Sequence, residues 1–196
     1  KKLLLIYDEV MTGFGRTGDW FASIKSNTQP DIICLSKGIT GGFLPLAVTA
    51  VTEKIFNQFF SNDISKTFFH GHSYTANPLA CAAALTSIQL LESNPQSFTS
   101  LERLHRENAQ KYLKQFLHKN VIYNLRFCGT IMAFDIGCDN NDYFSQIGPV
   151  LKQEFLKRDL LIRPLGNTIY LMPPYCVAEE QLDSIYQNIG QVLQSL

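Results

Sequence analysis

Two apolar runs that each end in an ionisable side chain constrain the fold of this chain more than any other feature of its sequence. Residues 3–7 lead into Asp8, and residues 32–35 lead through Ser36 into Lys37. Continuous apolar runs of this length are typical of strands in a parallel sheet that is covered on both faces. Open α/β sheets bind ligands at the carboxyl ends of such strands, so the sequence predicts that Asp8 and Lys37 lie at one ligand-binding edge.

An amine and a carboxylate at one edge suit a pyridine-aldehyde cofactor. The lysine amine can condense with the aldehyde, and the carboxylate can pair with the protonated ring nitrogen. The alternative is that Asp8 and Lys37 are solvated surface groups, as most lysines and aspartates are.

Composition argues against several other classes of protein. The chain has 196 residues, of which 45% are hydrophobic, and this suffices for a substantial core. Its 17 basic residues equal its 17 acidic residues in number, and no basic cluster indicates nucleic acid binding. No apolar run reaches membrane-spanning length, and no signal peptide is visible.

The cysteines favour a reducing, cytoplasmic setting. They are odd in number, widely spread and without a Cys-x-x-Cys pair, which argues against a disulfide framework or a zinc site. The five are Cys34, Cys81, Cys128, Cys138 and Cys176.

The hydrophobic pattern predicts an α/β part followed by a smaller α+β part, with a change of composition near residues 94–95. An apolar run typical of a buried strand begins directly after Lys1 and Lys2, with no helix or other strand before it. We therefore expect this chain to be the carboxyl-terminal part of a longer protein. The expected helices cover residues 53–60, 77–91, 97–119, 142–157 and 178–196, and further strands are expected at 121–127, 130–136, 160–163 and 168–172.

Two motifs suggest other ligands. The string GFGRTG at residues 13–18 matches the dinucleotide pattern G-x-G-x-x-G, but residues 8–12 separate it from the strand and their carboxylates would repel a pyrophosphate. His70 and His72 have no acidic or cysteine partner at a ligand spacing, so we expect no metal site. The loop around them precedes a helix amino terminus, where free amides and hydroxyls could instead hold a phosphate.

Arg163 is the remaining candidate for ligand binding. Its guanidinium offers a planar fork for a carboxylate, and Pro164 next to it would stiffen the backbone. The alternative is an ordinary surface salt bridge.

Taken together, these segments resemble the subgroup III (ω-type) aminotransferases, which are fold type I pyridoxal 5′-phosphate enzymes. The matching strings are IYDEVMTGFGRTG (6–18), DIICLSKGITGG (31–42) and HGHSYTANPLACAAA (70–84), and the resemblance extends over essentially the whole chain. It implies that residues 1–94 are the carboxyl-terminal part of a large, mostly parallel-sheet domain that binds the cofactor. Residues 95–196 would then form the small α+β domain.

The resemblance also implies roles for the cofactor-binding residues. Lys37 would be the catalytic residue that binds the cofactor covalently and moves a proton between substrate and cofactor. Asp8 would keep the pyridine nitrogen protonated. Ser73, with Gly71 and His72 in the same loop, would reach the cofactor phosphate of the partner subunit in a homodimer.

For the substrates, the resemblance implies that Arg163 binds the carboxylates of both in turn. Tyr170 and Gly71 would line the substrate pocket. Glu9 and Arg16 look like supports for the glycine-rich loop and the dimer interface.

The string IRPLGNTIYLMPPY (162–175) resembles the branch of this subgroup that acts in biotin synthesis. That branch implies S-adenosylmethionine as amino donor and 8-amino-7-oxononanoate as acceptor, although many relatives differ at Asn167 and Tyr170. The alternatives are a relative with an ornithine-, acetylornithine- or diamine-type donor, or an inactive remnant that serves as a scaffold. Family members are much longer than this chain, so we expect the isolated chain to be inactive or to bind cofactor poorly.

Overall fold

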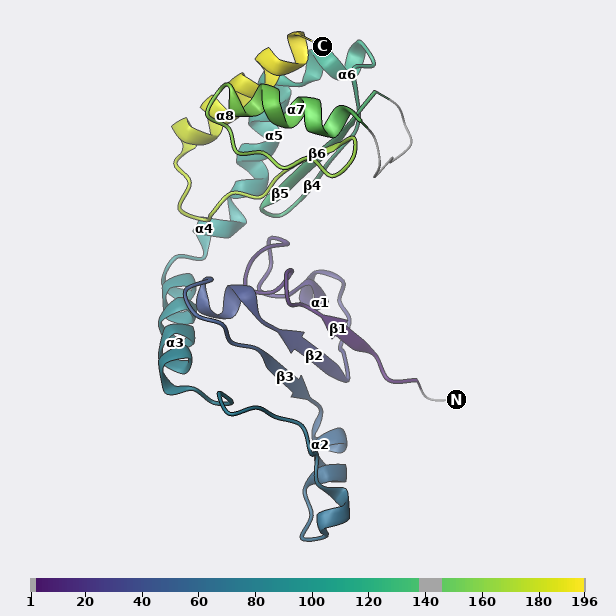
Figure 1. Ribbon diagram of the computed structural model, residues 1–196, viewed down its shortest axis with the longest axis vertical. Coiled ribbons are helices and arrows are strands. Elements are labelled where there is room, and N and C mark those ends of the chain that lie inside the picture. Colours follow the sequence, from purple (N-terminus) through teal and green to yellow (C-terminus); the bar gives the residue numbers. More distant parts are fainter. Residues whose placement is uncertain (1–2, 138–145, 196) are drawn as a thin grey trace. The chain divides into compact units, whose positions relative to one another are not determined.

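The chain divides into two units whose boundary falls between Pro95 and Gln96 (Figure 1). The structure is a computed structural model, and it describes residues 3–137 and 146–195. Cys138 and residues 142–145, the expected start of one helix, lie outside the described residues.

A three-stranded sheet in the order β1-β2-β3 organises the first unit. Strand β1 (Ile6–Asp8) pairs in parallel with β2 (Ile32–Leu35), and β2 pairs with β3 (Val48–Val51) in the antiparallel sense. The helices of this unit are α1 (Ala22–Lys25), η1 (Lys37–Thr40), α2 (Glu53–Phe59), η2 (Ile64–Lys66) and α3 (Pro78–Ser93).

The expectation of parallel strands is confirmed for β1 and β2, whereas the third strand, β3, runs antiparallel to β2. The segment between β2 and β3 contains the short turn η1 and no crossover helix, so the chain folds straight back beside β2. The expected cover on both faces is also absent from the described residues, since Ile6 is 59% and Val48 is 40% exposed.

Helix α3 packs against η1 and so supports the turn that begins at Lys37 (Figure 1). The small core of this unit joins Phe14, Ile39 and Ala84, one residue from each packed segment. The helix predicted at residues 77–91 is confirmed: Asn77 Oδ1 accepts hydrogen bonds from the amides of Leu79 (3.0 Å) and Ala80 (3.2 Å).

The second unit is an antiparallel sheet in the order β4-β5-β6, with helices α5, α7 and α8 against it (Figure 1). The strands are β4 (Ile122–Cys128), β5 (Ile131–Ile136) and β6 (Thr168–Leu171). The helices are α4 (Gln96–Thr99), α5 (Leu101–Tyr112), α6 (Lys114–His118), α7 (Ile147–Leu156) and α8 (Glu179–Gln194). A large core with fully buried Phe134, Phe155 and Tyr186 joins the sheet to the helices.

Two expectations for this unit are wrong. Residues 97–119 form three helices, because the chain bends at Ser100 and Leu113, and Leu113 and Phe116 thereby join the core of this unit. Residues 160–163 form no strand. The proline that follows them lacks an amide for a ladder, and the nearest bridge joins Leu165 to Thr168.

Candidate active site

The carboxyl ends of β1 and β2 bring Asp8 and Lys37 to the same edge of the sheet. Asp8 lies opposite Cys34 in the parallel register, and Lys37 follows Cys34 by three residues, at the start of η1. This is the edge at which the sequence predicted a ligand site.

The backbone at Lys37 is held in an unusual conformation. Its φ angle is +42°, in the left-handed region that residues other than glycine rarely adopt. Ser36 Oγ donates to the Leu46 carbonyl (2.7 Å), which fixes the residue before it. A Cβ atom on Gly38 would lie 3.0 Å from Phe14 Cβ, tighter than an ordinary contact, so glycine at this position favours close packing of the glycine-rich loop against η1. Strain of this kind is typical of functional positions.

The reactive atoms of this pair are open to a ligand. Asp8 Oδ1 accepts a hydrogen bond from the Val10 amide (3.1 Å), which orients the carboxylate. Among the described residues, Asp8 Oδ2 and the Lys37 amine have no hydrogen-bond partner, and both side chains are exposed. A carboxylate oxygen and an amine at one sheet edge fit a cofactor with a basic ring nitrogen and an aldehyde.

Glu9 organises the loop that follows Asp8. Its side chain is 1% exposed, and its Oε1 accepts from the Ser23 amide (2.8 Å). Its Oε2 accepts from the Ala22 amide (2.8 Å) and from Thr12 Oγ1 (2.9 Å). The Glu9 carboxylate therefore links the glycine-rich loop to α1 through hydrogen bonds, and it is not available to a ligand.

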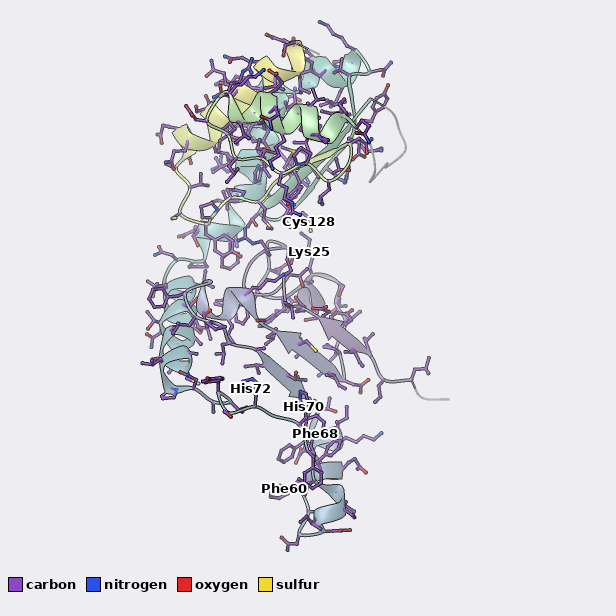
Figure 2. The ribbon with its side chains drawn as sticks, in the orientation of Figure 1. Lys25, Phe60, Phe68, His70, His72 and Cys128 are labelled. Atoms are coloured by element: carbon purple, nitrogen blue, oxygen red, sulfur yellow. The ribbon has the colours of Figure 1, made fainter. Side chains whose placement is uncertain are left out.

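The segment with His70 and His72 runs from α2 to α3 (Figure 2). His72 Nδ1 accepts from the Tyr74 amide (3.1 Å), and Thr75 Oγ1 donates to the His72 carbonyl (2.8 Å). The sequence predicted free amides at the start of α3 that could bind a phosphate. Asn77 caps this first turn and already accepts hydrogen bonds from the amides of Leu79 and Ala80. The Ser73 amide and hydroxyl have no partner among the described residues, and Gly71 is open to solvent. An anion held by this loop would therefore contact Ser73 and not the helix end.

Arg163 and Tyr170 belong to the second unit. They lie on either side of the turn into β6, where Tyr170 pairs with Ala133 of β5. Both line a pocket of about 470 Å³ whose other walls are mostly apolar, including Leu161 and Met172. Arg163 is exposed and forms no ion pair with the described residues of its unit, so the expected alternative of a surface salt bridge is not observed there.

No group of three side chains capable of holding a metal ion occurs in residues 3–137 and 146–195. Over the same ranges, no helix is both long enough and apolar enough to cross a membrane.

An α/β sheet edge that presents an unpaired amine and a carboxylate fits the class of pyridoxal-phosphate-dependent transferases. The chain belongs to the aminotransferase class-III family, whose model matches residues 1–193. Enzymes of this family use pyridoxal 5′-phosphate. The family match and the solved neighbours confirm the predicted fold class.

Similar proteins cover nearly the whole chain. An adenosylmethionine-8-amino-7-oxononanoate aminotransferase of Synechococcus elongatus is 48% identical over 98% of this chain and 45% of its own length. The crystal structure of the Methanocaldococcus jannaschii protein of the same name is 32% identical, with a TM-score of 0.83 over 98% of this chain and 46% of that one. An amine transaminase from an uncultivated Pseudomonas species, in its PLP-bound (internal aldimine) form, is 28% identical with a TM-score of 0.87, over 98% of this chain and 45% of that one. The chain thus spans about half the length of the relatives it matches.

Proposed function

We propose that this chain supplies the catalytic lysine of a pyridoxal-phosphate-dependent aminotransferase that acts in biotin synthesis. The reaction would move an amino group from S-adenosylmethionine to 8-amino-7-oxononanoate and give 7,8-diaminononanoate. The observation that supports this class of reaction is the position of Asp8 and Lys37 at the same edge of the sheet. The name of the 48% identical relative supports the choice of substrates.

Lys37 and Asp8 divide the chemistry between them. When bound, the cofactor supplies a pyridine ring that accepts the electron pair released at the substrate carbon. The Lys37 amine would take the proton from that carbon and pass it to the cofactor, which requires an amine that is free of other partners. The Asp8 carboxylate holds a proton on the ring nitrogen, with Oδ2 as the free acceptor and Oδ1 fixed by the Val10 amide.

The remaining site residues would bind and orient the cofactor and the substrate. Ser73, flanked by Gly71 and His72, would hold the cofactor phosphate through its amide and hydroxyl. Arg163 would bind the substrate carboxylate, with Tyr170 on the pocket wall beside it. The loop at 71–73 would act on the partner's cofactor, so the functional form would be a homodimer in the cytoplasm.

Covalent labelling tests this proposal. The native protein is incubated with pyridoxal 5′-phosphate, reduced with borohydride and mapped by peptide mass spectrometry. We expect the label on Lys37 and a loss of about 10²–10⁴-fold in transamination rate for Lys37→Ala, as for removal of a catalytic base. Lys66→Ala, an exposed lysine on η2, is the matched control and should retain full activity.

A label on another lysine, or none, would contradict the proposal. A donor screen decides the substrate: turnover with S-adenosylmethionine and not with ornithine, acetylornithine or a diamine supports the biotin branch, and the reverse result assigns another member of the family.

A further inference from the structure

We propose that Gly148, on α7, is a positioning residue for carboxylate binding by Arg163. It allows α7 to press against the turn that connects Arg163 to Tyr170, and so fixes the arginine relative to the pocket. The inference rests on the proposed function for the identity of the ligand, a carboxylated substrate, and on the geometry of the second unit for the mechanism.

The turn itself is a tight hairpin between Leu165 and Thr168. The amide of each donates to the carbonyl of the other, at 2.9 Å in both cases. Gly166 has a φ angle of 59° and occupies the first central position, which favours glycine in hairpins of this length. Arg163 lies two residues before this turn and Tyr170 two residues after it, so the turn controls the position of both.

Helix α7 contacts this turn more closely than any residue with a side chain would permit. A Cβ atom on Gly148 would lie 2.6 Å from the Gly166 carbonyl oxygen and 3.7 Å from Pro164 Cβ. The first distance is a clash with backbone, which cannot be relieved by rotating a side chain. An alanine at position 148 could not keep the same approach of α7 to the turn.

The turn is also tied to the end of β5 by hydrogen bonds. Asn167 is 2% exposed; its carbonyl accepts from the Ile136 amide (3.0 Å), and its Nδ2 donates to the Ile136 carbonyl (3.1 Å). Thr168 Oγ1 donates to Asp135 Oδ1 at 2.7 Å. These bonds to β5 and the close contact with α7 together restrict movement of the turn.

A fixed turn matters for binding because a carboxylate needs both guanidinium N–H groups at correct distances and angles. An arginine on a mobile segment would lose conformational freedom with each binding event, whereas a fixed one does not. Displacing the turn should therefore weaken carboxylate binding while leaving the amine and carboxylate at Lys37 and Asp8 unaffected.

Gly148→Ala tests the inference, with Gly190→Ala as matched control. Gly190 also lies within a helix of the second unit, but there a Cβ atom would be 3.6 Å from its nearest neighbour, the Tyr112 carbonyl oxygen, in ordinary contact. In the native protein we expect Gly148→Ala to raise the KM for the carboxylated substrate roughly tenfold, with a smaller change in kcat. Gly190→Ala should change neither.

Hydrogen exchange supplies a readout that does not depend on activity. The amides of Leu165 and Thr168 should exchange faster in Gly148→Ala than in the parent and at the parent rate in Gly190→Ala. Unchanged exchange together with an unchanged KM would overturn the inference. If the parent protein fails to bind cofactor at Lys37, the proposed function falls, and the exchange rates still decide whether Gly148 positions the turn.

A second variant covers the possibility that Gly148→Ala does not fold. Thr168→Val keeps the shape of the side chain but removes its hydrogen bond to Asp135, and so loosens the link between the turn and β5. We expect a higher KM for the carboxylated substrate and faster exchange at Leu165. A parent-like KM and exchange rate in Thr168→Val would reject the idea that fixing this turn positions Arg163.

Discussion

At the scale of single residues, Glu9 shows how the carboxylate next to Asp8 serves structure. It accepts hydrogen bonds from two backbone amides and one hydroxyl while nearly fully buried. Glu9→Ala would leave these donors unsatisfied, and we expect it to lower the free energy of unfolding by about 2–3 kcal/mol, measured by urea denaturation. Glu53→Ala, an exposed glutamate in the first turn of α2, should cost far less; equal losses would contradict this role for Glu9.

His105 gives the second unit a pH dependence. It is fully buried, its Nε2 donates to the Thr130 carbonyl (3.2 Å), and its Nδ1 accepts from the Tyr186 hydroxyl (2.8 Å). Burial lowers the pKa of His105, and the Thr130 carbonyl and the Glu102 charge only partly offset this. Below about pH 6.5 the unfolded chain therefore binds a proton that the folded chain does not, and stability falls as pH decreases.

Denaturation at pH 7.5 and 5.5 measures this effect. His105→Gln should be less stable at pH 7.5 but should lose less of its remaining stability on acidification than the parent. His118→Gln, which alters an exposed histidine at the end of α6, should keep the parent's pH dependence. A parent-like pH dependence in His105→Gln would assign the effect to other groups.

The sequence predicts part of the residue-level site. Two apolar runs ending in Asp8 and Lys37 predict their common edge, because the carboxyl ends of parallel strands lie at the same edge of a sheet. The buried position of Glu9 could not be predicted, since it depends on how the glycine-rich loop folds back onto α1. Asn77 before Pro78 is a capping signal that the sequence does show, and the cap is confirmed. The distance from Arg163 to Lys37 depends on the placement of the two units, which no local pattern encodes.

At the scale of elements, helix capping supports the lysine turn. Asn77 caps α3, and Ser87 on the same helix donates to the Gly38 carbonyl (3.3 Å) beside Lys37. Asn77→Ala should destabilise the first unit by about 1 kcal/mol and speed hydrogen exchange at Leu79 and Ala80. Asn77→Asp retains the acceptor and should behave like the parent; a loss as large as that of Asn77→Ala would show that the acceptor is not what matters.

Local signals explain which elements were predicted correctly. Asn77 followed by Pro78 marks the start of α3, and Cys128-Gly129 lies at the hairpin between β4 and β5, so these elements are confirmed. The region at 97–119 has a continuous helical pattern, and its bend at Leu113 arises only from packing against the second core. The antiparallel direction of β3 likewise depends on the length of its connection and not on its composition.

At the scale of the whole chain, the two units differ in how much core each possesses. Nineteen buried apolar side chains form one cluster in the second unit, against three in the first, among the described residues. The first unit also exposes large side chains such as Phe43 (82%) and Phe69 (81%). Hydrophobic burial is the main favourable contribution to folding, so the second unit should hold its structure without the first, and the reverse should fail.

Separate expression of residues 96–196 and 1–95 tests this difference. We expect the 96–196 fragment to unfold cooperatively in urea, with a free energy of about 5–10 kcal/mol as for other small domains. The 1–95 fragment should lose its circular dichroism gradually and bind a dye specific for exposed apolar surface. Phe134→Ala, at 0% exposure, should destabilise the 96–196 fragment by about 3–5 kcal/mol, whereas Leu161→Ala, at 85% exposure, should have little effect. A cooperative transition in 1–95, or its absence in 96–196, would show that the buried cluster is not what sets the stability of either unit.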